Sequence, residues 1–282
     1  MSDDRERLAG AALVLVAHGS SKNAHSRRAV LQHGIELRRR GLFAEVHEAF
    51  YKEPPWIRDT WTDTRASDLF VIPVFMSEGY FTQTVVPRDL GVAPDAARNG
   101  LWMVQRGART LRYGRPVGTH PKMTEVLLAR IDRVLSESPD APAPETIAVI
   151  VAGHGTTRDD RSREIIDRQV AQLRGLNRFG EVHAAFMEEE LRIADYPAYV
   201  QAADVVVVPF FVSDGMHVLE DIPVLLGESE AEVCRRLEWG EPVWTNPAVH
   251  HGKRIWYTPS VGTEPVIAEV ILERLAELLE TD

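Results

Sequence analysis

The stretch VVVVPFFVSDGMHVLEDIP, residues 205–223, shows how the chain is organised, because an earlier stretch has the same framework. That earlier stretch is LFVIPVFMSEGYFTQTVVP, residues 69–87, which starts 136 positions upstream (205 − 69). Each begins with an apolar run typical of a buried strand and continues with Pro, Ser and Gly at the same places. The later copy has His217 where the earlier copy has Phe81. The sequence therefore repeats one structural unit and changes one chemically important residue.

The repeat extends over both halves of the chain. At the same spacing, the tripeptide at His18 matches the one at His154 (154 − 18 = 136), and EVHEAFYKE from Glu45 matches EVHAAFMEE from Glu181. Further on, VGTHPKMTEVLLARI matches VGTEPVIAEVILERL, which starts 144 positions later (261 − 117). The eight extra residues (144 − 136) fall between Gly227 and Val261, where we expect a loop or an extended helix. The chain is an internal duplication.

A linker separates the two copies. The stretch SESPDAPAPET, residues 136–146, is rich in Pro and Ala and has no apolar periodicity, as linkers do. We therefore expect an N-terminal lobe over residues 1–142 and a C-terminal lobe over residues 143–282.

Each copy alternates strand-like runs with helical patterns. The runs expected to form strands are residues 11–17, 46–50 and 69–75 in the first copy and 147–152, 182–186 and 205–211 in the second. Residues 26–40 and 123–135 have the spacing of amphipathic helices. This alternation predicts an α/β fold of two tandem, duplicated Rossmann-like lobes with mostly parallel sheets, and we expect the active cleft between the lobes.

Composition narrows the class of protein. The net charge of −10 argues against a nucleic-acid partner, and no apolar run approaches the roughly 20 residues that cross a bilayer. The single cysteine, Cys234, excludes an internal disulfide and a cysteine-held iron–sulfur cluster within one chain. The polar, acidic first residues do not resemble a secretory signal, so we expect a cytoplasmic protein without membrane contact. No phosphate-binding Gly-rich loop appears, so we expect no nucleotide.

The second copy has candidate ligands after three strands. His154, Glu188 and His217 each follow an expected strand, and ligands bind at the carboxyl ends of strands in open α/β sheets. Imidazole with carboxylate suits divalent cobalt, iron, nickel or zinc. The first copy has His18, but Lys52 and Phe81 replace the other two, so we expect the metal site in the second copy alone. Glu189 or Glu190 remains an alternative to Glu188.

The loops after the first strand of each copy run into a helix. Their hydroxyl residues fit helix capping, and the same geometry also presents backbone N–H groups to an anion. Arg158, Arg161 and Arg163 add charges that suit carboxylates.

The motifs VAHGSS, VAGHGTT, AFMEE and PFFVSDGMHVLEDIP resemble those of the CbiX/SirB-type sirohydrochlorin chelatases, and the duplication is similar to the long, two-domain CbiX form. The resemblance covers roughly residues 11–280. It implies a class II chelatase fold and a lyase that inserts Co²⁺, or Fe²⁺ in relatives, into the tetrapyrrole sirohydrochlorin without ATP, in cobalamin or siroheme biosynthesis. It implies that His154, His217 and Glu188 are catalytic and handle the metal. Some long relatives carry a cysteine-rich segment that holds an iron–sulfur cluster, but with Cys234 alone we expect this chain to lack one.

The resemblance also suggests how the tetrapyrrole is held. Arg158, Arg161 and Arg27 would pair with its carboxylates. His18, Tyr80 and Phe81 of the first copy would contact the macrocycle, although plain packing of the aromatic residues is an equal alternative. We expect a monomer or a weak homodimer, and Ni²⁺ remains a further candidate metal. Whether His18 or His120 takes part is left open at this point.

Two other functions fit the same residues. A non-catalytic metal or tetrapyrrole carrier would use the same ligands but release nothing. A small-molecule sensor would use the histidines as polar groups of a pocket.

Overall fold

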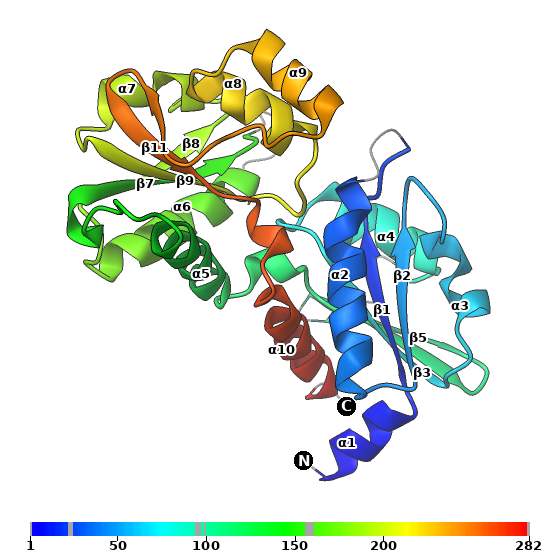
Figure 1. The fold of residues 1–282 in the computed structure, drawn as a ribbon. Coiled ribbons are helices and arrows are strands. Elements are labelled where there is room, and N and C mark those ends of the chain that lie inside the picture. Colours follow the sequence, from blue (N-terminus) through cyan, green and yellow to red (C-terminus); the bar gives the residue numbers. More distant parts are fainter. Residues whose placement is uncertain (1, 22–24, 94–96, 99, 156–160, 281–282) are drawn as a thin grey trace. The chain divides into compact units, whose positions relative to one another are not determined.

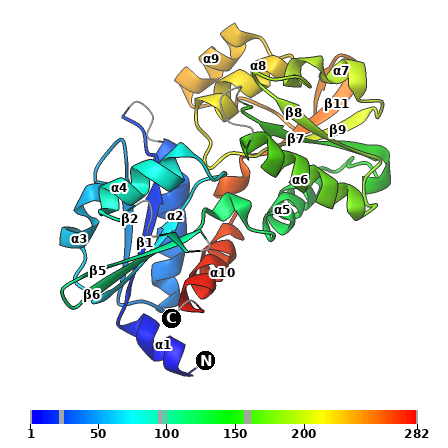
Figure 2. The same ribbon diagram turned by 180° about the vertical axis from the view of Figure 1, so that it is seen from behind.

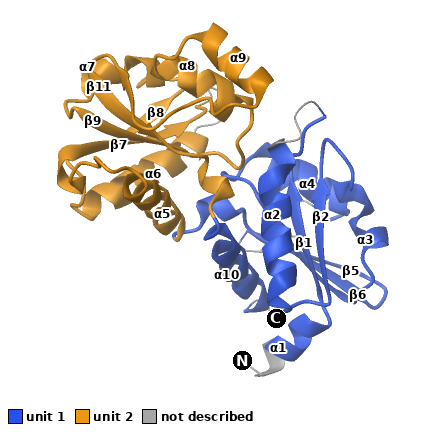
Figure 3. Cartoon of the chain, in the orientation of Figure 1, with its two compact units in different colours: residues 1–121, 265–282 blue, residues 122–264 orange. Residues whose placement is uncertain are grey.

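The computed structural model describes residues 2–21, 25–93, 97–98, 100–155 and 161–280. The chain forms two compact units, one of residues 1–121 with 265–282 and one of residues 122–264 (Figure 3). Each unit is a mostly parallel sheet covered by helices, so the expected α/β fold class is confirmed. Among the described residues, no helix has the length and apolar character needed to span a membrane.

The sheet of unit 1 has six strands in the order β2-β1-β3-β6-β5-β4 (Figure 1). The first four are parallel, and β5 and β4 join them as an antiparallel extension. The strands are β1 (Ala12–Ala17), β2 (Glu45–Phe50), β3 (Asp68–Pro73), β4 (Ala97–Arg98), β5 (Leu101–Arg106) and β6 (Arg109–Tyr113).

The sheet of unit 2 has five strands in the order β10-β11-β9-β7-β8. Four are parallel and β10 is antiparallel to β11. The strands are β7 (Ile147–Gly153), β8 (Glu181–Phe186), β9 (Asp204–Pro209), β10 (Ala248–His250) and β11 (Lys253–Tyr257). Every residue of β7 is buried, as a central parallel strand covered on both faces must be.

Helices cover both faces of each sheet (Figures 1 and 2). In unit 2, α5 and α6 lie on one face, and α7, α8 and α9 lie on the other. The helices of unit 1 are α1 (Ser2–Ala9), α2 (His25–Arg40), α3 (Thr60–Asp63), α4 (Val86–Leu90) and α10 (Ile267–Leu279). Those of unit 2 are α5 (Met123–Ser136), α6 (Arg161–Gly175), α7 (Tyr196–Tyr199), α8 (Ile222–Leu226) and α9 (Glu230–Trp239).

Short 3₁₀ and π turns complete the units. The 3₁₀ turns are η1 (Ile57–Asp59), η4 (Val117–Thr119), η5 (Pro144–Thr146), η6 (Ile193–Asp195) and η8 (Val261–Thr263). One π-helical turn precedes the short helix after the third strand of each copy: η2 (Phe81–Val85) and η7 (His217–Asp221). Both copies of the repeat therefore keep the same unusual backbone at the position where Phe81 and His217 differ.

The compact units are not the two sequence copies. Helix α5 ends the first copy but packs against α6, β9 and β11 in unit 2, whereas α10 ends the second copy and packs against α2 and β3 in unit 1. The copies exchange their last helices. The repeat boundary near residue 143 therefore lies inside unit 2, because an apolar helical face does not specify which of two similar sheets it will cover.

The eight extra residues of the second copy contribute to a helix. The α9 helix begins after Ser229, whose hydroxyl accepts a hydrogen bond from the backbone N–H of Glu232 at its start. In the first copy the corresponding connection leads through β4 into β5. The expectation of a loop or an extended helix is thus resolved in favour of a helix.

Candidate metal centre

The three ligand candidates of the second copy lie at one edge of the unit 2 sheet. His154 follows β7, Glu188 follows β8 and His217 follows β9. These strands are neighbours in the order β8-β7-β9 and run parallel, so their carboxyl ends meet at one edge. Backbone N–H groups of Met187 and Glu188 donate to the carbonyl oxygen of His154, at 3.1 and 3.3 Å, which ties two of these strand ends together.

The two imidazoles are in contact. The ring centroids of His154 and His217 lie 4.8 Å apart and the ring planes are nearly perpendicular, at 88°. Nδ1 of His154 lies 2.8 Å from the carbonyl oxygen of Gly155, and Nδ1 of His217 lies 2.6 Å from Oδ2 of Asp221. A carbonyl and a carboxylate accept hydrogen bonds, so each Nδ1 is the donor. In the neutral rings both Nε2 lone pairs are then available to a metal.

Gly155 provides the carbonyl oxygen that accepts the hydrogen bond from His154. Its φ of +66° lies in the left-handed region, which glycine adopts readily. A Cβ at this position would lie 3.0 Å from Cβ of Phe186 and 3.1 Å from Cγ of Glu189, closer than side-chain carbons normally pack. The tight turn after β7 therefore requires a glycine, and it places the Gly155 carbonyl oxygen within hydrogen-bond distance of Nδ1 of His154.

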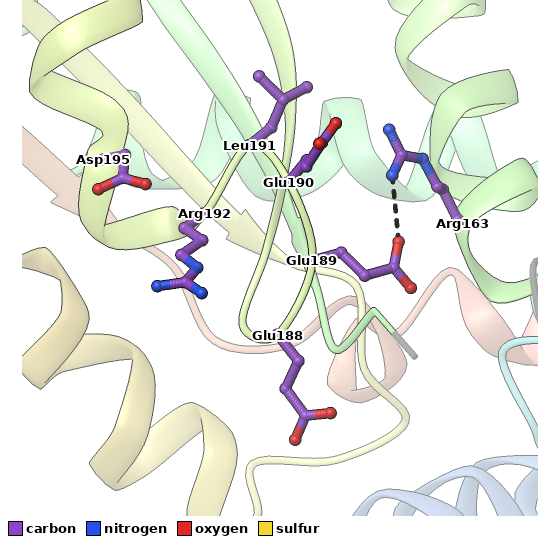
Figure 4. A pocket seen from close by; sticks show the side chains of 7 residues that line it. All are labelled: Arg163, Glu188, Glu189, Glu190, Leu191, Arg192 and Asp195. Carbon is purple, nitrogen blue, oxygen red and sulfur yellow. Dashed lines mark hydrogen bonds and ion pairs between the residues drawn. The ribbon is translucent and has the colours of Figure 1, made fainter. Parts of the chain in front are cut away.

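The three consecutive glutamates after β8 have different roles (Figure 4). They line an open pocket of about 600 Å³ together with Arg163, Leu191, Arg192 and Asp195. Oε2 of Glu189 accepts a hydrogen bond from Arg163 at 3.2 Å, and the side chain of Glu188 points away from that pair. Glu188 and Glu190 are exposed.

The first copy shows which glutamate is structural. Glu53 is the equivalent of Glu189, and it accepts from Arg27 at 3.3 Å and from the backbone N–H of Ser20 at 3.0 Å. Arg27 is in turn the equivalent of Arg163. The same arginine–glutamate pair thus braces the turn after the first strand in both copies, with and without a second histidine. This leaves Glu188 and Glu190 as the acids available for a metal.

The structure brings two of the three expected ligands together. Among the described residues, no group of three or more His, Cys, Asp and Glu side chains lies close enough to hold a metal ion. His154 and His217 are adjacent, whereas the carboxylate of Glu188 does not join them.

The arginines expected to bind substrate carboxylates differ in exposure and in whether they already pair with an acid. Arg158 lies outside the described residues. Arg161 is exposed and is the first residue of α6. Arg27 is half-exposed but already paired with Glu53.

The residues expected to contact the macrocycle form an aromatic cluster in unit 1. The Phe81 ring lies 4.8 Å from His18 at 84°, 5.4 Å from Tyr51 and 6.0 Å from Tyr80, centroid to centroid. Nδ1 of His18 lies 2.9 Å from the carbonyl oxygen of Gly19. The His18–Phe81 pair therefore repeats the arrangement of His154 and His217 with a benzene ring in place of an imidazole.

His120 belongs to the packing of an exchanged helix. It is buried, and its Nε2 lies 3.9 Å from Oε1 of Glu277 on α10. The equivalent residue of the other copy, Glu264, is buried against Arg130 and Arg133 of α5. Both positions therefore anchor the last helix of the opposite copy within their own unit.

Two residues near the site were not anticipated. Asp221 holds Nδ1 of His217, and the hydroxyl of Tyr257 donates to the carbonyl oxygen of Val218 at 2.7 Å. A signal for Asp221 was present in the sequence: it follows His217 by four residues, and the first copy has Val85 at that place. Tyr257 comes from β11 and carries no such local signal.

The family and curated relatives agree with the motifs. The CbiX family model matches residues 12–134 and 148–278. A protein of Halobacterium salinarum named probable sirohydrochlorin cobaltochelatase is 37% identical over 276 residues, which cover 94% of this chain and 91% of that protein. A Methanopyrus kandleri protein named sirohydrochlorin cobaltochelatase is 29% identical over 147 residues, 47% of this chain and 97% of that protein.

Solved structures share the fold. A multi-domain Deinococcus radiodurans protein, described as structurally similar to chelatases, matches with a TM-score of 0.76 at 28% identity; the match covers 95% of this chain but 55% of that one. The sirohydrochlorin chelatase SirB from Bacillus subtilis, in complex with cobalt, matches with a TM-score of 0.63 at 14% identity over 96% of this chain and 95% of that one. The family match spans both copies of the repeat, and the chain belongs to the CbiX family.

Proposed function

We propose that the chain is a chelatase that inserts a divalent metal ion, most readily Co²⁺, into sirohydrochlorin without ATP. The observation that carries the proposal is the contact between His154 and His217, with both Nδ1 atoms engaged as donors and both Nε2 atoms left for a metal. The names of the curated relatives support the same reaction. The metal and the tetrapyrrole are both substrates.

Two imidazoles suit a metal that must be passed on. The hydrated ion would exchange part of its water shell for the Nε2 atoms of His154 and His217, which are borderline ligands for Co²⁺, Fe²⁺ and Ni²⁺. Glu188, an exposed residue after the neighbouring strand β8, would have to turn toward them to add a third contact as the ion arrives. Such a ligand set holds the ion through few protein contacts, so the four ring nitrogens can take it over.

The Nε2 lone pairs of His154 and His217 would also accept the two protons that the macrocycle releases. Insertion of a divalent ion into the free macrocycle breaks two pyrrole N–H bonds, forms bonds from the metal to the ring nitrogens and releases two protons, so charge and atoms balance. As the metal leaves each Nε2, that atom becomes a base within reach of the ring. The two histidines would thus provide one acceptor for each proton.

Each unit has side chains that fit a flat, acidic substrate. Tyr80 and Met216, at equivalent positions of the two copies, expose 64% and 52% of their surfaces and are therefore accessible to a ligand. Either can lie against a macrocycle face, as we propose for His18 and Phe81. Arg161, with Arg158 and Arg27, is proposed to pair with substrate carboxylates.

The proposal predicts rapid metallation by the purified protein. Sirohydrochlorin is mixed with Co²⁺, Fe²⁺ or Ni²⁺, and the absorbance spectrum is followed in time beside a metal-only blank. His217→Ala is expected to slow metallation at least about a hundredfold, on the scale of a lost acid–base group. Phe81→Ala, the matched change in the other copy, removes a ring that we propose to contact the macrocycle but no metal ligand, so it is expected to slow metallation less than His217→Ala.

Three results would contradict the chelatase. Wild type no faster than the blank would exclude catalysis, and tight, stoichiometric metal binding without turnover would then point to a carrier. If a His154→Ala, His217→Ala double variant still binds the tetrapyrrole as tightly as wild type, the result would favour a small-molecule sensor.

A further inference from the structure

Asp221 is joined to His217 within one turn of the chain. Its Oδ2 lies 2.6 Å from Nδ1 of His217, and the two residues are the first and last of the π-helical turn η7. Both side chains are about half-exposed, at 47% for His217 and 46% for Asp221. In the part of the chain that the structure describes, Asp221 has no other hydrogen-bond or ion-pair partner, so its carboxylate is committed to the imidazole.

The two copies of the repeat differ at both members of this pair. Phe81 and Val85 occupy the equivalent places in η2, which has the same π-helical backbone. The carboxylate is thus present where the imidazole is present, and an apolar residue replaces it where a phenyl ring replaces the imidazole. The backbone turn does not require an acid, since η2 forms without one. Asp221 is therefore tied to the chemistry of His217.

The nitrogen that the carboxylate engages separates this pair from ordinary surface pairs. His47 and His183 also contact carboxylates, those of Glu45 and Glu181, but they do so through Nε2, at 2.8 Å each. His217 and His154 engage acceptors through Nδ1. The histidines of the candidate centre thus keep Nε2 for another partner, whereas His47 and His183 use Nε2 to contact a glutamate of their own strand.

The two site histidines need different acceptors because of where they lie. His154 follows a strand and reaches the carbonyl oxygen of the next residue, Gly155. His217 begins a helical turn in which backbone carbonyls accept intrahelical hydrogen bonds. At His217 the carboxylate of Asp221 is therefore the hydrogen-bond acceptor, whereas at His154 a backbone carbonyl has this role.

We propose that Asp221 is a positioning residue that holds His217 in the tautomer with hydrogen on Nδ1 and makes its Nε2 the stronger metal ligand. A carboxylate behind a ligating imidazole fixes the ring orientation and raises its basicity, and its removal typically weakens metal binding 10- to 100-fold. This role rests on the proposed function, because it assumes that His217 binds the metal substrate.

The test measures the tautomer and the metal affinity separately from catalysis. In metal-free full-length protein, long-range ¹⁵N–¹H correlation spectra report which ring nitrogen of His217 carries hydrogen. Wild type is expected to show hydrogen on Nδ1, and Asp221→Val, which installs the first-copy residue, to shift the population toward Nε2. Titration with Co²⁺ alone, followed by calorimetry, is expected to give a Kd about 10- to 100-fold higher in the variant.

Two further variants keep the test sharp. Asp221→Glu keeps the carboxylate and is expected to recover most of the affinity, which a purely structural role would not predict. Glu220→Gln removes the neighbouring carboxylate, which makes no hydrogen bond to His217. It should leave both the His217 tautomer and the Kd for Co²⁺ unchanged. Circular dichroism checks that each variant is folded.

The proposal is overturned if Asp221→Val retains the Nδ1 tautomer, or if its Co²⁺ affinity stays within twofold of wild type. It is also overturned if Glu220→Gln weakens binding as much as Asp221→Val, because general charge would then explain the effect. A wild type that binds Co²⁺ but does not metallate sirohydrochlorin would contradict the chelatase while leaving these readings intact.

Discussion

The guanidinium group of Arg130 donates two hydrogen bonds to the carbonyl oxygen of Ser260, at 3.2 and 2.9 Å, although 130 residues separate them in the chain. The equivalent residue of the second copy, Arg274, donates to the carbonyl oxygen of Pro116 at 3.1 Å. Each of these buried arginines lies on an exchanged helix and contacts the other copy of the repeat. Arg130 and Arg274 thus attach α5 and α10 to the units that these exchanged helices join.

Loss of the Arg130 anchor should destabilise unit 2. Arg130 also lies 3.1 Å from Glu264, which is 1% exposed, so Arg130→Ala leaves a buried carboxylate short of a cation. We expect the unfolding free energy to fall by about 3 kcal/mol. Urea unfolding measures it, with the exposed Arg39→Ala as a control that should cause no measurable change. An equal loss in the two variants would contradict the anchor.

The helix exchange predicts which fragments fold. Residues 122–264 contain all of unit 2, whereas residues 143–282 lack α5 and carry α10 instead. We expect the first fragment to unfold cooperatively in urea and the second to remain partly unfolded, because one face of its sheet loses α5, one of the two helices that cover it. A fragment of residues 143–282 as cooperative as that of residues 122–264 would show that α10 can replace α5.

Tyr257 should matter for activity because it supports the turn that carries His217. Burial, and then the nearby Asp214 carboxylate, raise the pKa of Tyr257 well above its usual value, so its hydroxyl keeps its hydrogen and donates to Val218. Tyr257→Phe is expected to cost about 1–2 kcal/mol of stability and to slow metallation. Thermal unfolding and the metallation assay measure the two effects.

Tyr113 provides the matched control for this change. Its hydroxyl donates to the carbonyl oxygen of Thr82 at 2.8 Å, the same contact in the first copy. Tyr113→Phe is expected to cost similar stability without changing the metallation rate. If both variants slow metallation equally, support of His217 is not the reason.

The roles of the consecutive glutamates can be separated. Glu188→Gln is expected to slow metallation about 10- to 100-fold with little loss of stability, because Glu188 is exposed and does not brace the turn. Glu189→Gln is expected to lower stability, because it weakens the pair with Arg163. Glu53→Gln, its first-copy equivalent, should behave like Glu189→Gln in an unfolding experiment. The reverse pattern would make Glu189 the ligand.

Acid should destabilise the fold through two equivalent carboxylates. Burial alone would raise the pKa of Glu181, but hydrogen bonds from His183 and from the backbone N–H groups of Gln201 and Ala202 outweigh it and lower the pKa below its usual 4.5. The pKa of Glu45 is lowered in the same way, by His47 and two backbone N–H groups.

The sign of the pH dependence follows from these lowered values. Each ionised carboxylate stabilises the fold fully above pH 4.5, and this contribution is lost as the pH falls through the lowered folded-state pKa. The Glu45→Gln, Glu181→Gln double variant should lose about 1–2 kcal/mol per site at pH 7 and show a shallower decline below pH 4.5. Urea unfolding at several pH values, with the exposed Glu145→Gln as control, measures this; parallel curves would contradict it.

Much of the site could be predicted because it depends on local patterns. The strands that precede His154 and His217 are continuous apolar runs, and parallel neighbours must bring their carboxyl ends to one edge. The repeat then showed that the first copy has Phe81 in place of the second imidazole. The choice among Glu188, Glu189 and Glu190 could not be made in this way, since adjacent loop residues differ in direction and not in pattern.

The sequence by itself determined the duplication, the α/β class and the copy that carries both histidines, because these depend on short-range periodicity and on comparison of the two repeats. The tertiary structure alone decided that α5 and α10 exchange, since two similar sheets compete for similar apolar helices and buried contacts such as Arg130 with Ser260 select between them. It also decided that Glu189 braces a turn and that Asp221 orients His217. Hydrogen bonds of this kind depend on the directions of side chains, which are known only when the folded backbone is in place.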